Sequence, residues 1–432
     1  MRFPTTLVVF ALLQSLPADA TVGHFVKRTT DRFHTVALKH SAGLAHDLRT
    51  AFGGILVARS PVRVGITAGG SGKPYCVSSK GSIGNTNSGS NPQANGNSTG
   101  STSSKGSKPS STSSGATPSS TFTSDWKLLQ AYSGNSFFQG WNFFTGGDPT
   151  NGIVNYVNQG TAQSNNLTSI NDAGNAIMRV ETTPQVQGNR QSVRITSQLV
   201  YTGGLVVLDS VHMPTGCGTW PAFWSNGPNW PAGGEIDIVE GVNDYTNNQA
   251  TIHTNPGCSM PTSNTNTLAI SGSIVGGTNC AAAQTGNQGC GVRAVQTNSF
   301  GGAFNDNGGG VYAMQWDNSG ISVFFFPRSN IPADITAGAP NPDGWGTAMA
   351  RWPASSCNPF QFFKTHSMIF DTTLCGDWAS GVWGATGVPG QEQSCAQRTG
   401  VATCEQFVQQ NGAAFNDAYW EVKSVKVYQN KS

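Results

Sequence analysis

The stretch GGEIDIVEGVND, residues 233–244, decides how the chain is interpreted, because it places three carboxylates among apolar residues. β-Branched residues separate the acids and two glycines precede them, so the segment is predicted to be a β-strand. In a regular strand Glu235 and Asp237 share one face, and Glu240 lies on the other. A β-bulge between Asp237 and Glu240 would add one residue and turn Glu240 to the face of the other two acids.

Three carboxylates on one face are unfavourable, and their mutual repulsion should raise at least one pKa. Hydrolysis of a glycosidic bond needs two carboxyl groups in different protonation states, one ionised as nucleophile and one protonated as general acid. A third acid between them can hydrogen-bond the nucleophile. If Glu235 and Glu240 are this pair in a retaining enzyme, their carboxyl groups should lie roughly 5 to 5.5 Å apart.

Two other interpretations of the acidic strand are open. Clustered carboxylates also bind calcium, but calcium loops usually supply their oxygens from irregular, glycine-turned segments and not from a β-branched strand. A solvated edge strand is the second interpretation, and it does not explain the neighbouring aromatic residues. No metal and no cofactor are expected here.

Aromatic residues crowd the segment before the acids, GTWPAFWSNGPNWPAGG, residues 218–234. Flat aromatic faces match the apolar C–H faces of sugar rings, so a tryptophan-lined groove beside an acid pair suits a polysaccharide. Trp230, Trp220 and Trp224 are the candidate substrate-binding residues, and Trp230 is favoured because it lies closest to the acids in sequence. Packing in the core is the alternative for some of these aromatics, namely Phe223 and also Trp224.

The rest of the C-terminal region predicts an all-β domain. Short β-rich runs recur and no long helical period appears, which favours an antiparallel sandwich of two sheets. The predicted strands cover 175–183, 191–201, 204–213, 235–241, 248–254, two strands within 310–327 that meet in a turn at 317–320, 366–373 and 418–429.

The N-terminal part has a different character. Residues 1–20 carry Arg2, the apolar run LVVFALL and a small-residue end ADA, the pattern of a cleaved secretory signal. Residues 21–77 are interpreted as a pro-segment or N-terminal extension, and 78–123, rich in Ser, Gly, Asn and Thr, as a disordered linker. Residues 124–432 form the predicted catalytic domain. We therefore expect a secreted, extracellular protein without membrane association.

Cysteine and sequon positions fit that compartment. Eight of the nine cysteines lie in the C-terminal region, and none forms a C-x-x-C pair, so disulfides are favoured over zinc, with the connectivity left open. The exception is Cys76. Candidate N-glycosylation sites are Asn97 and Asn166, with Asn430 as a third.

Charge is unevenly distributed along the 432 residues. Residues 1–123 hold 12 Lys and Arg against 3 Asp and Glu, whereas residues 124–432 hold 12 against 19. The acidic balance of the predicted catalytic domain disfavours nucleic-acid binding. We expect a monomer whose partner is a polysaccharide.

The segment GEIDIVE resembles the E-[ILV]-D-x-x-E signature of glycoside hydrolase family 16. Residues 124–432 are similar to the fungal laminarinase-type endo-1,3(4)-β-glucanases of that family, through GTWPAFW, ATIHTNPGC, YAMQWDNSGISVFFFP and FDTTLCGDWA. The resemblance implies a β-jelly-roll sandwich with a concave substrate cleft. It also implies Glu235 as nucleophile, Asp237 as assisting acid and Glu240 as general acid/base, with His253 beside them. A hydrogen-bonded core histidine is the alternative for His253.

The motif is one residue longer than in lichenases and plant xyloglucan transferases, and in this respect it resembles the laminarinase branch. That favours β-1,3 or mixed β-1,3/1,4 glucans as substrates, and the expected closeness of the two carboxyl groups favours hydrolysis with retention. A transglycosylase would use the same covalent intermediate. A non-catalytic glucan-binding protein would be marked by loss of an acid, and all three are present. Sequence leaves open which glucan is preferred and what becomes of residues 21–123.

Overall fold

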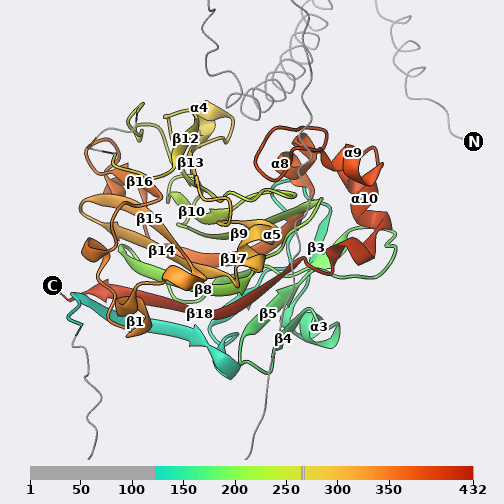
Figure 1. Ribbon diagram of the computed structural model, residues 1–432, viewed down its shortest axis with the longest axis horizontal. Helices are drawn as coiled ribbons and strands as arrows, with labels where there is room; N and C mark the ends of the chain where they lie inside the picture. The colour runs from blue at the N-terminus through green and yellow to red at the C-terminus, as the bar shows by residue number, and fades with distance from the viewer. Residues whose placement is uncertain (1–121, 264–265, 267, 432) are drawn as a thin grey trace, which may run out of the picture. The chain divides into compact units, whose positions relative to one another are not determined.

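The structure is a computed structural model that describes residues 122–263, 266 and 268–431 (Figure 1). The predicted signal peptide, the predicted N-terminal extension, almost all of the predicted linker, Cys76 and Asn97 lie outside the described residues. The description below therefore concerns the predicted catalytic domain.

Two eight-stranded sheets build the domain, and all pairings within them are antiparallel. The first sheet runs β16-β15-β14-β8-β18-β5-β4, and β1 also pairs with β18. Its strands are β1 (Trp126–Ser133), β4 (Thr168–Ile170), β5 (Ala176–Arg179), β8 (Gly204–His212), β14 (Gly310–Asp317), β15 (Gly320–Pro327), β16 (Ala350–Pro353) and β18 (Tyr419–Asn430).

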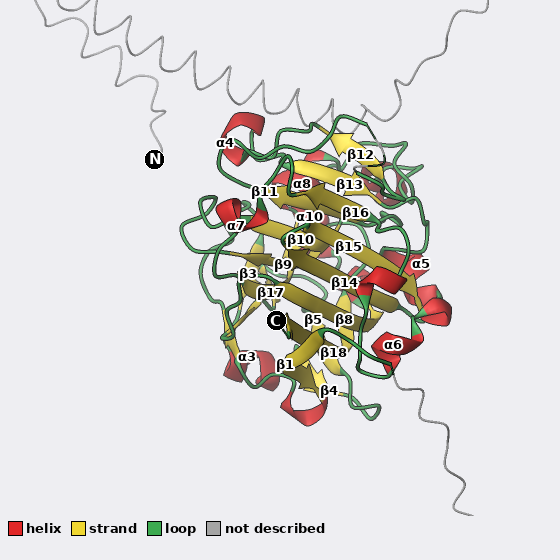
Figure 2. Cartoon of the chain, turned by 90° about the vertical axis from the view of Figure 1, so that its left-hand side faces the viewer, coloured by secondary structure: helices red, strands yellow, loops and turns green. Residues whose placement is uncertain are grey.

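The second sheet runs β12-β13-β11-β10-β9-β17-β7-β2. Its strands are β2 (Trp141–Phe143), β7 (Ile195–Ser197), β9 (Thr219–Asn226), β10 (Glu235–Glu240), β11 (Gln249–His253), β12 (Ser273–Gly276), β13 (Cys290–Arg293) and β17 (Ser367–Leu374). A small parallel pair, β3 (Val154–Tyr156) and β6 (Arg190–Ser192), stands apart. Figure 2 shows the strands of the two sheets running in similar directions, as in an aligned sandwich.

The core lies between the sheets. In the second sheet Phe223 of β9 and Phe370 of β17 are fully buried, with ring centroids 4.4 Å apart, and they join the same hydrophobic cluster as Trp316 of β14 in the first sheet. Burying one such side chain contributes roughly 1.5 to 3 kcal/mol. The assignment of Phe223 to packing is confirmed, and the predicted jelly-roll sandwich of two antiparallel sheets is the observed fold.

Helices in the described residues are short, as the absence of a helical period predicts. The α-helices are α3 (Gln159–Ser164), α4 (Ala282–Thr285), α5 (Gly301–Asp306), α6 (Ala333–Thr336), α7 (Pro359–Phe362), α8 (Gly376–Gly381), α9 (Cys395–Thr399) and α10 (Cys404–Gln410). The 3₁₀ helices are Gly134–Ser136, Arg328–Asn330, Pro342–Gly344 and Gly412–Phe415. Among the described residues, no helix has the length and hydropathy that crossing a membrane requires.

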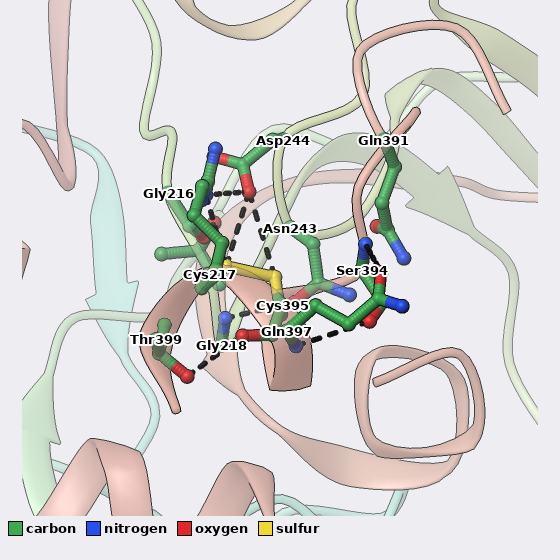
Figure 3. Close-up of polar contacts among 12 residues, drawn as sticks. Gly216, Cys217, Gly218, Asn243, Asp244, Gln391, Ser394, Cys395, Gln397 and Thr399 are labelled. Atoms are coloured by element: carbon green, nitrogen blue, oxygen red, sulfur yellow. Dashed lines mark hydrogen bonds and ion pairs between the residues drawn. A yellow bond between two sulfur atoms is a disulfide. The ribbon is translucent and has the colours of Figure 1, made fainter. Parts of the chain in front are cut away.

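Four disulfides pair the eight cysteines of this region, which confirms the preference for disulfides over zinc. The pairs are Cys217–Cys395, Cys258–Cys357, Cys280–Cys290 and Cys375–Cys404. Two of them fasten α9 and α10 to the ends of β9 and β17. Figure 3 shows the Cys217–Cys395 bridge, where the Asp244 carboxylate lies 3.1 and 3.5 Å from the two sulfurs. These links hold the helices, which gather beside one end of the sheets, against the sandwich (Figure 1).

Most predicted strands are present, and two differences have a physical cause. The turn predicted at 317–320 joins β14 to β15, where Asp317 pairs with Gly320. The single strand predicted at 191–201 is wrong, because the chain leaves β6 at Ser192 and enters the second sheet as β7 at Ile195. No strand is predicted for the aromatic-rich segment 219–226, which forms β9 in the middle of the second sheet.

Candidate active site

The pairing of β10 with β9 places the three acids on one face of the second sheet. Glu235 lies opposite Asn226, Asp237 opposite Trp224, and Glu240 opposite Ala222. Alternate residues of β9 point to the same side, so the three acids do as well. The register shifts between Asp237 and Val239, which leaves Ile238 as the extra residue of a bulge. The predicted bulge is confirmed, and the side that carries the acids is called the acid face below.

The opposite side of β10 explains why the strand tolerates this arrangement. Ile236, Ile238 and Val239 are at most 1% exposed and belong to the hydrophobic core. Before the strand, Gly234 has a φ of +77°, and a Cβ at this position would collide with the Phe363 ring. The two glycines therefore do more than prevent a helix, since the turn into β10 requires Gly234.

His253 lies beside two of the acids, as the family resemblance implies. It pairs with Glu235 across β10 and β11, and the residue is 7% exposed. Its Nε2 lies 3.3 Å from Asp237 Oδ2 and 3.8 Å from Glu235 Oε1. The histidine is buried, its Nδ1 has no hydrogen-bond partner among the described residues, and its Nε2 contacts the acids, which favours the place implied by the resemblance over a hydrogen-bonded core histidine.

The three tryptophans approach the acid face in different ways. Trp220 Nε1 donates a hydrogen bond of 2.8 Å to Glu240 Oε1. The side chain of Trp230 is 44% exposed and hydrogen-bonds Glu235. Trp224 is partly exposed opposite Asp237 and not in the core, so the alternative that assigned it to packing is wrong.

A fourth carboxylate on this face was missed from the sequence. Asp371 of β17 is 5% exposed and lies opposite Ala222 of β9. Trp224 Nε1 donates to its Oδ2 at 3.1 Å, and Arg194 Nη1 lies 4.0 Å from the same oxygen. The FDTTLCGDWA segment contains Asp371, but only the register of β17 against β9 shows which face it occupies.

Burial and mutual repulsion raise the pKa values of these acids. Burial and, to a smaller extent, the charge of Asp237 raise the pKa of Glu235 to about 8 and the pKa of Glu240 to about 8. Burial and then the charge of Asp371 raise the pKa of Asp237 well above its usual range. Burial raises the pKa of Asp371 to about 6, against the lowering effects of Arg194 and Trp224.

The acid face therefore retains protons at neutral pH, and its carboxyl groups titrate as a coupled set. Such a set can supply one ionised and one protonated carboxyl at the same time, as general acid catalysis at a glycosidic bond requires. Glu235, Asp237 and His253 also offer ligand atoms within 4.8 Å of one another, a spacing that a metal ion could use. The expectation that no metal is needed stays a prediction.

Comparison with known proteins also points to a glycoside hydrolase. The family model described as the XgeA-like catalytic domain of glycoside hydrolase family 16 matches residues 141–428. A probable endo-1,3(4)-β-glucanase of Aspergillus clavatus is 44% identical over 311 residues, which cover 71% of this chain and 47% of that protein. A probable glycosidase of Schizosaccharomyces pombe is 41% identical over 70% of this chain and 69% of its own length. The chain thus matches about half the length of the Aspergillus protein.

Two solved structures are similar over the whole of their chains. Laminarinase 16A of Phanerochaete chrysosporium, solved with two β-glucans in its donor and acceptor sites, is 40% identical with a TM-score of 0.63. The match covers 70% of this chain and 99% of that one. An elongating β-1,3-glucosyltransferase is 36% identical with a TM-score of 0.63, over 70% of this chain and all of that one.

Proposed function

Because the chain belongs to glycoside hydrolase family 16, we propose that residues 124–432 form an endo-acting β-glucanase that cleaves β-1,3 and mixed β-1,3/1,4 glucans. The observation that carries the proposal is the acid face, where Glu235, Asp237 and Glu240 lie together beside three tryptophans. The β-glucans bound to the similar laminarinase support this class of substrate. Retention of configuration and export from the cell are parts of the same proposal.

In the proposed reaction Glu235 attacks the anomeric carbon while Glu240 gives its proton to the departing glycosidic oxygen. The bond between carbon and oxygen breaks, and a covalent glycosyl-enzyme forms on Glu235. Glu240, now ionised, then removes a proton from a water molecule that attacks the same carbon and releases Glu235. The raised pKa of Glu240 favours its protonated form before the first step. The pKa of Glu235 is raised equally, so the first step uses the state of the coupled pair in which Glu235 is ionised and Glu240 holds the proton.

Asp237 and His253 assist through their contacts. Asp237 lies between the two glutamates on the acid face, and its raised pKa favours a protonated carboxyl that can donate a hydrogen bond to the Glu235 carboxylate. The His253 side chain lies within 3.8 Å of Glu235 and within 3.3 Å of Asp237. Trp220, Trp224 and Trp230 would contact sugar rings in the concave cleft that the family resemblance implies.

A second candidate function is transfer of the glycosyl group to another glucan. The similarity to an elongating β-1,3-glucosyltransferase favours it, since only the acceptor of the covalent intermediate differs. Chromatography of products from a laminarin oligosaccharide separates the two: shorter products alone indicate hydrolysis, and products longer than the substrate indicate transfer.

Export is supported by the four disulfides, which persist in oxidising compartments. N-terminal sequencing of the protein recovered from culture medium would test it.

The stereochemistry of the first product tests the mechanism. Two displacements at the anomeric carbon restore its configuration, so proton NMR of a laminarin digest should show the β-anomer first and the α-anomer only after mutarotation. An α-anomer as first product would refute retention. Binding of laminarin without release of reducing sugar would instead indicate a non-catalytic glucan-binding protein.

Azide rescue distinguishes the two glutamates. With an activated aryl glycoside, azide should attack the sugar directly in Glu235→Ala and give an α-glycosyl azide. In Glu240→Ala azide should intercept the intermediate on Glu235 and give the β-azide. Asp317→Ala, at the turn between β14 and β15 in the other sheet, is the matched control and should form no azide adduct. Swapped configurations would exchange the two roles.

A further inference from the structure

One row across the acid face joins Glu240 to Asp371. Both residues lie opposite Ala222, Glu240 on β10 and Asp371 on β17. Neighbouring strands are about 4.8 Å apart, so two strand spacings place the two backbones roughly 10 Å apart. Ala222 is the residue between them in this row, and its side chain is only a methyl group.

Two tryptophans on the same strand as Ala222 each bind one of these carboxyls. Trp220 donates to Glu240, and Trp224 donates to Asp371. Arg194 completes the second pair, with its guanidinium 5.1 Å from the Trp224 ring centroid and 4.0 Å from Asp371 Oδ2. Asp371 therefore fixes the indole of Trp224 at one edge, while Arg194 lies over its ring.

We propose that Asp371 is a positioning residue of the acid face, which orients the Trp224 indole and places a negative charge across Ala222 from Glu240. It does not take part in bond making. Its charge favours the protonated form of the proposed general acid, and its hydrogen bond holds a proposed sugar-binding ring in place. The kinetic consequences rest on the proposed function, whereas the orientation of Trp224 does not.

The charges around this row come from several elements. Glu240 faces Glu235 and Asp237 on its own strand, Trp220 on β9, His253 on β11 and Asp371 on β17. Asp371 faces Arg194 before β7, Trp224 on β9, Asp237 on β10, Asp148 before β3 and Tyr156 at the end of β3. Burial raises the pKa of Glu240 most, then the charge of Asp237, and the charge of Asp371 adds a smaller increase. Asp371 also raises the pKa of Asp237. Neutralising Asp371 should therefore lower the pKa of the general acid. Arg194, left without its partner, acts in the same direction.

The pH dependence of kcat/KM tests the charge. Activity falls as pH rises through the pKa of the general acid. In Asp371→Asn, which keeps an oxygen for Trp224, the basic limb should move down by up to about 0.6 pH units, the effect of a unit charge at the backbone separation of roughly 10 Å and an effective dielectric of about 40. The KM should stay within about twofold. Asp371→Leu also removes the acceptor, so its KM should rise about fivefold. Asp317→Asn is the control and should leave the profile unchanged.

A measurement independent of catalysis tests the orientation of Trp224. The indole N–H resonance of Trp224 in a ¹⁵N spectrum, assigned with Trp224→Phe, should shift as pH passes about 6, where Asp371 titrates. This step should vanish in Asp371→Asn and persist in Asp317→Asn. An unmoved basic limb, or a persistent step near pH 6 in Asp371→Asn, overturns the proposal. If the wild-type protein cleaves no glucan, the proposed function fails, and the NMR titration alone tests the positioning role of Asp371.

Discussion

Glu240 is held between opposing influences. Burial and the neighbouring carboxylates raise its pKa, whereas the hydrogen bond from Trp220 stabilises the ionised form and lowers it. A general acid/base has to alternate between both forms in one catalytic cycle, so neither form can be too stable. The Trp220 hydrogen bond, together with the nearby His253, thus makes the ionised state of Glu240 accessible.

Replacing Trp220 by Phe should move the basic limb of kcat/KM to higher pH. The ring remains but the donor is lost, so the ionised form of Glu240 is less stable and its pKa rises, by roughly 1 pH unit. The direction is opposite to that expected for Asp371→Asn. Trp378→Phe is the control, because the Trp378 ring packs on Trp220 but its hydrogen bond goes to Tyr245. A downward shift in Trp220→Phe would contradict this account of Glu240.

At the scale of the element, β10 combines a polar and an apolar side within six residues. The bulge reconciles the two, because Ile238 takes the extra place while Val239 lies opposite Phe223 and Glu240 opposite Ala222. Removing one residue at the bulge would restore a regular strand without changing the pairing of Glu240 with β9. The acid face should therefore survive the deletion.

Deleting Ile238 should leave a protein that folds and retains activity. We expect kcat/KM to fall by up to about 100-fold, the cost of a misplacement of about 1 Å, and stability to fall because a buried isoleucine is lost. Laminarin hydrolysis and urea unfolding measure the two effects. Glu240→Gln in the deleted background is the control, and it should remove most of the remaining activity. Residual activity that is insensitive to Glu240→Gln would show that the acid no longer faces the substrate.

At the scale of the whole molecule, the described residues hold a large core and four disulfides. One hydrophobic cluster fills the sandwich, and a second joins α10 to the Cys375 and Cys217 ends of β17 and β9. Two disulfides span this second cluster, so the C-terminal helices and the sandwich are joined both by packing and by covalent links. This part of the chain has what independent folding requires.

A truncated protein that begins at residue 124 should fold and keep its activity. It retains both of these clusters and all four disulfides, and it lacks only residues with little apolar content or outside the family match. Circular dichroism on heating should show one cooperative transition within a few degrees of that of the full chain. Loss of that transition would show that residues 1–123 belong to the folded unit. Cys76→Ser in the full chain serves as the control for the removed thiol.

The sequence alone determined the fold class and the acid strand. Alternation of apolar and polar residues is a local property, so a two-sheet antiparallel sandwich followed from short β-rich runs, and the bulge followed from the odd spacing of Glu240. Even cysteine number and the absence of C-x-x-C pairs predicted disulfides without their pairing. Strands β9 and β7 were harder to predict from the sequence. Trp and Pro residues and a change of sheet interrupt the alternation of apolar and polar residues there.

Only the tertiary structure decided which distant residues meet the acids. Asp371 lies 131 residues beyond Glu240 in the chain, and nothing in its own segment shows that it shares a row with Glu240 across Ala222. Arg194 and the orientation of Trp224 depend on the same register. Strand order and register are set by packing of the whole sandwich, since long-range pairings depend on contacts that no local pattern contains. The raised pKa values depend on this register too, because burial and neighbouring charge exist only in the folded chain.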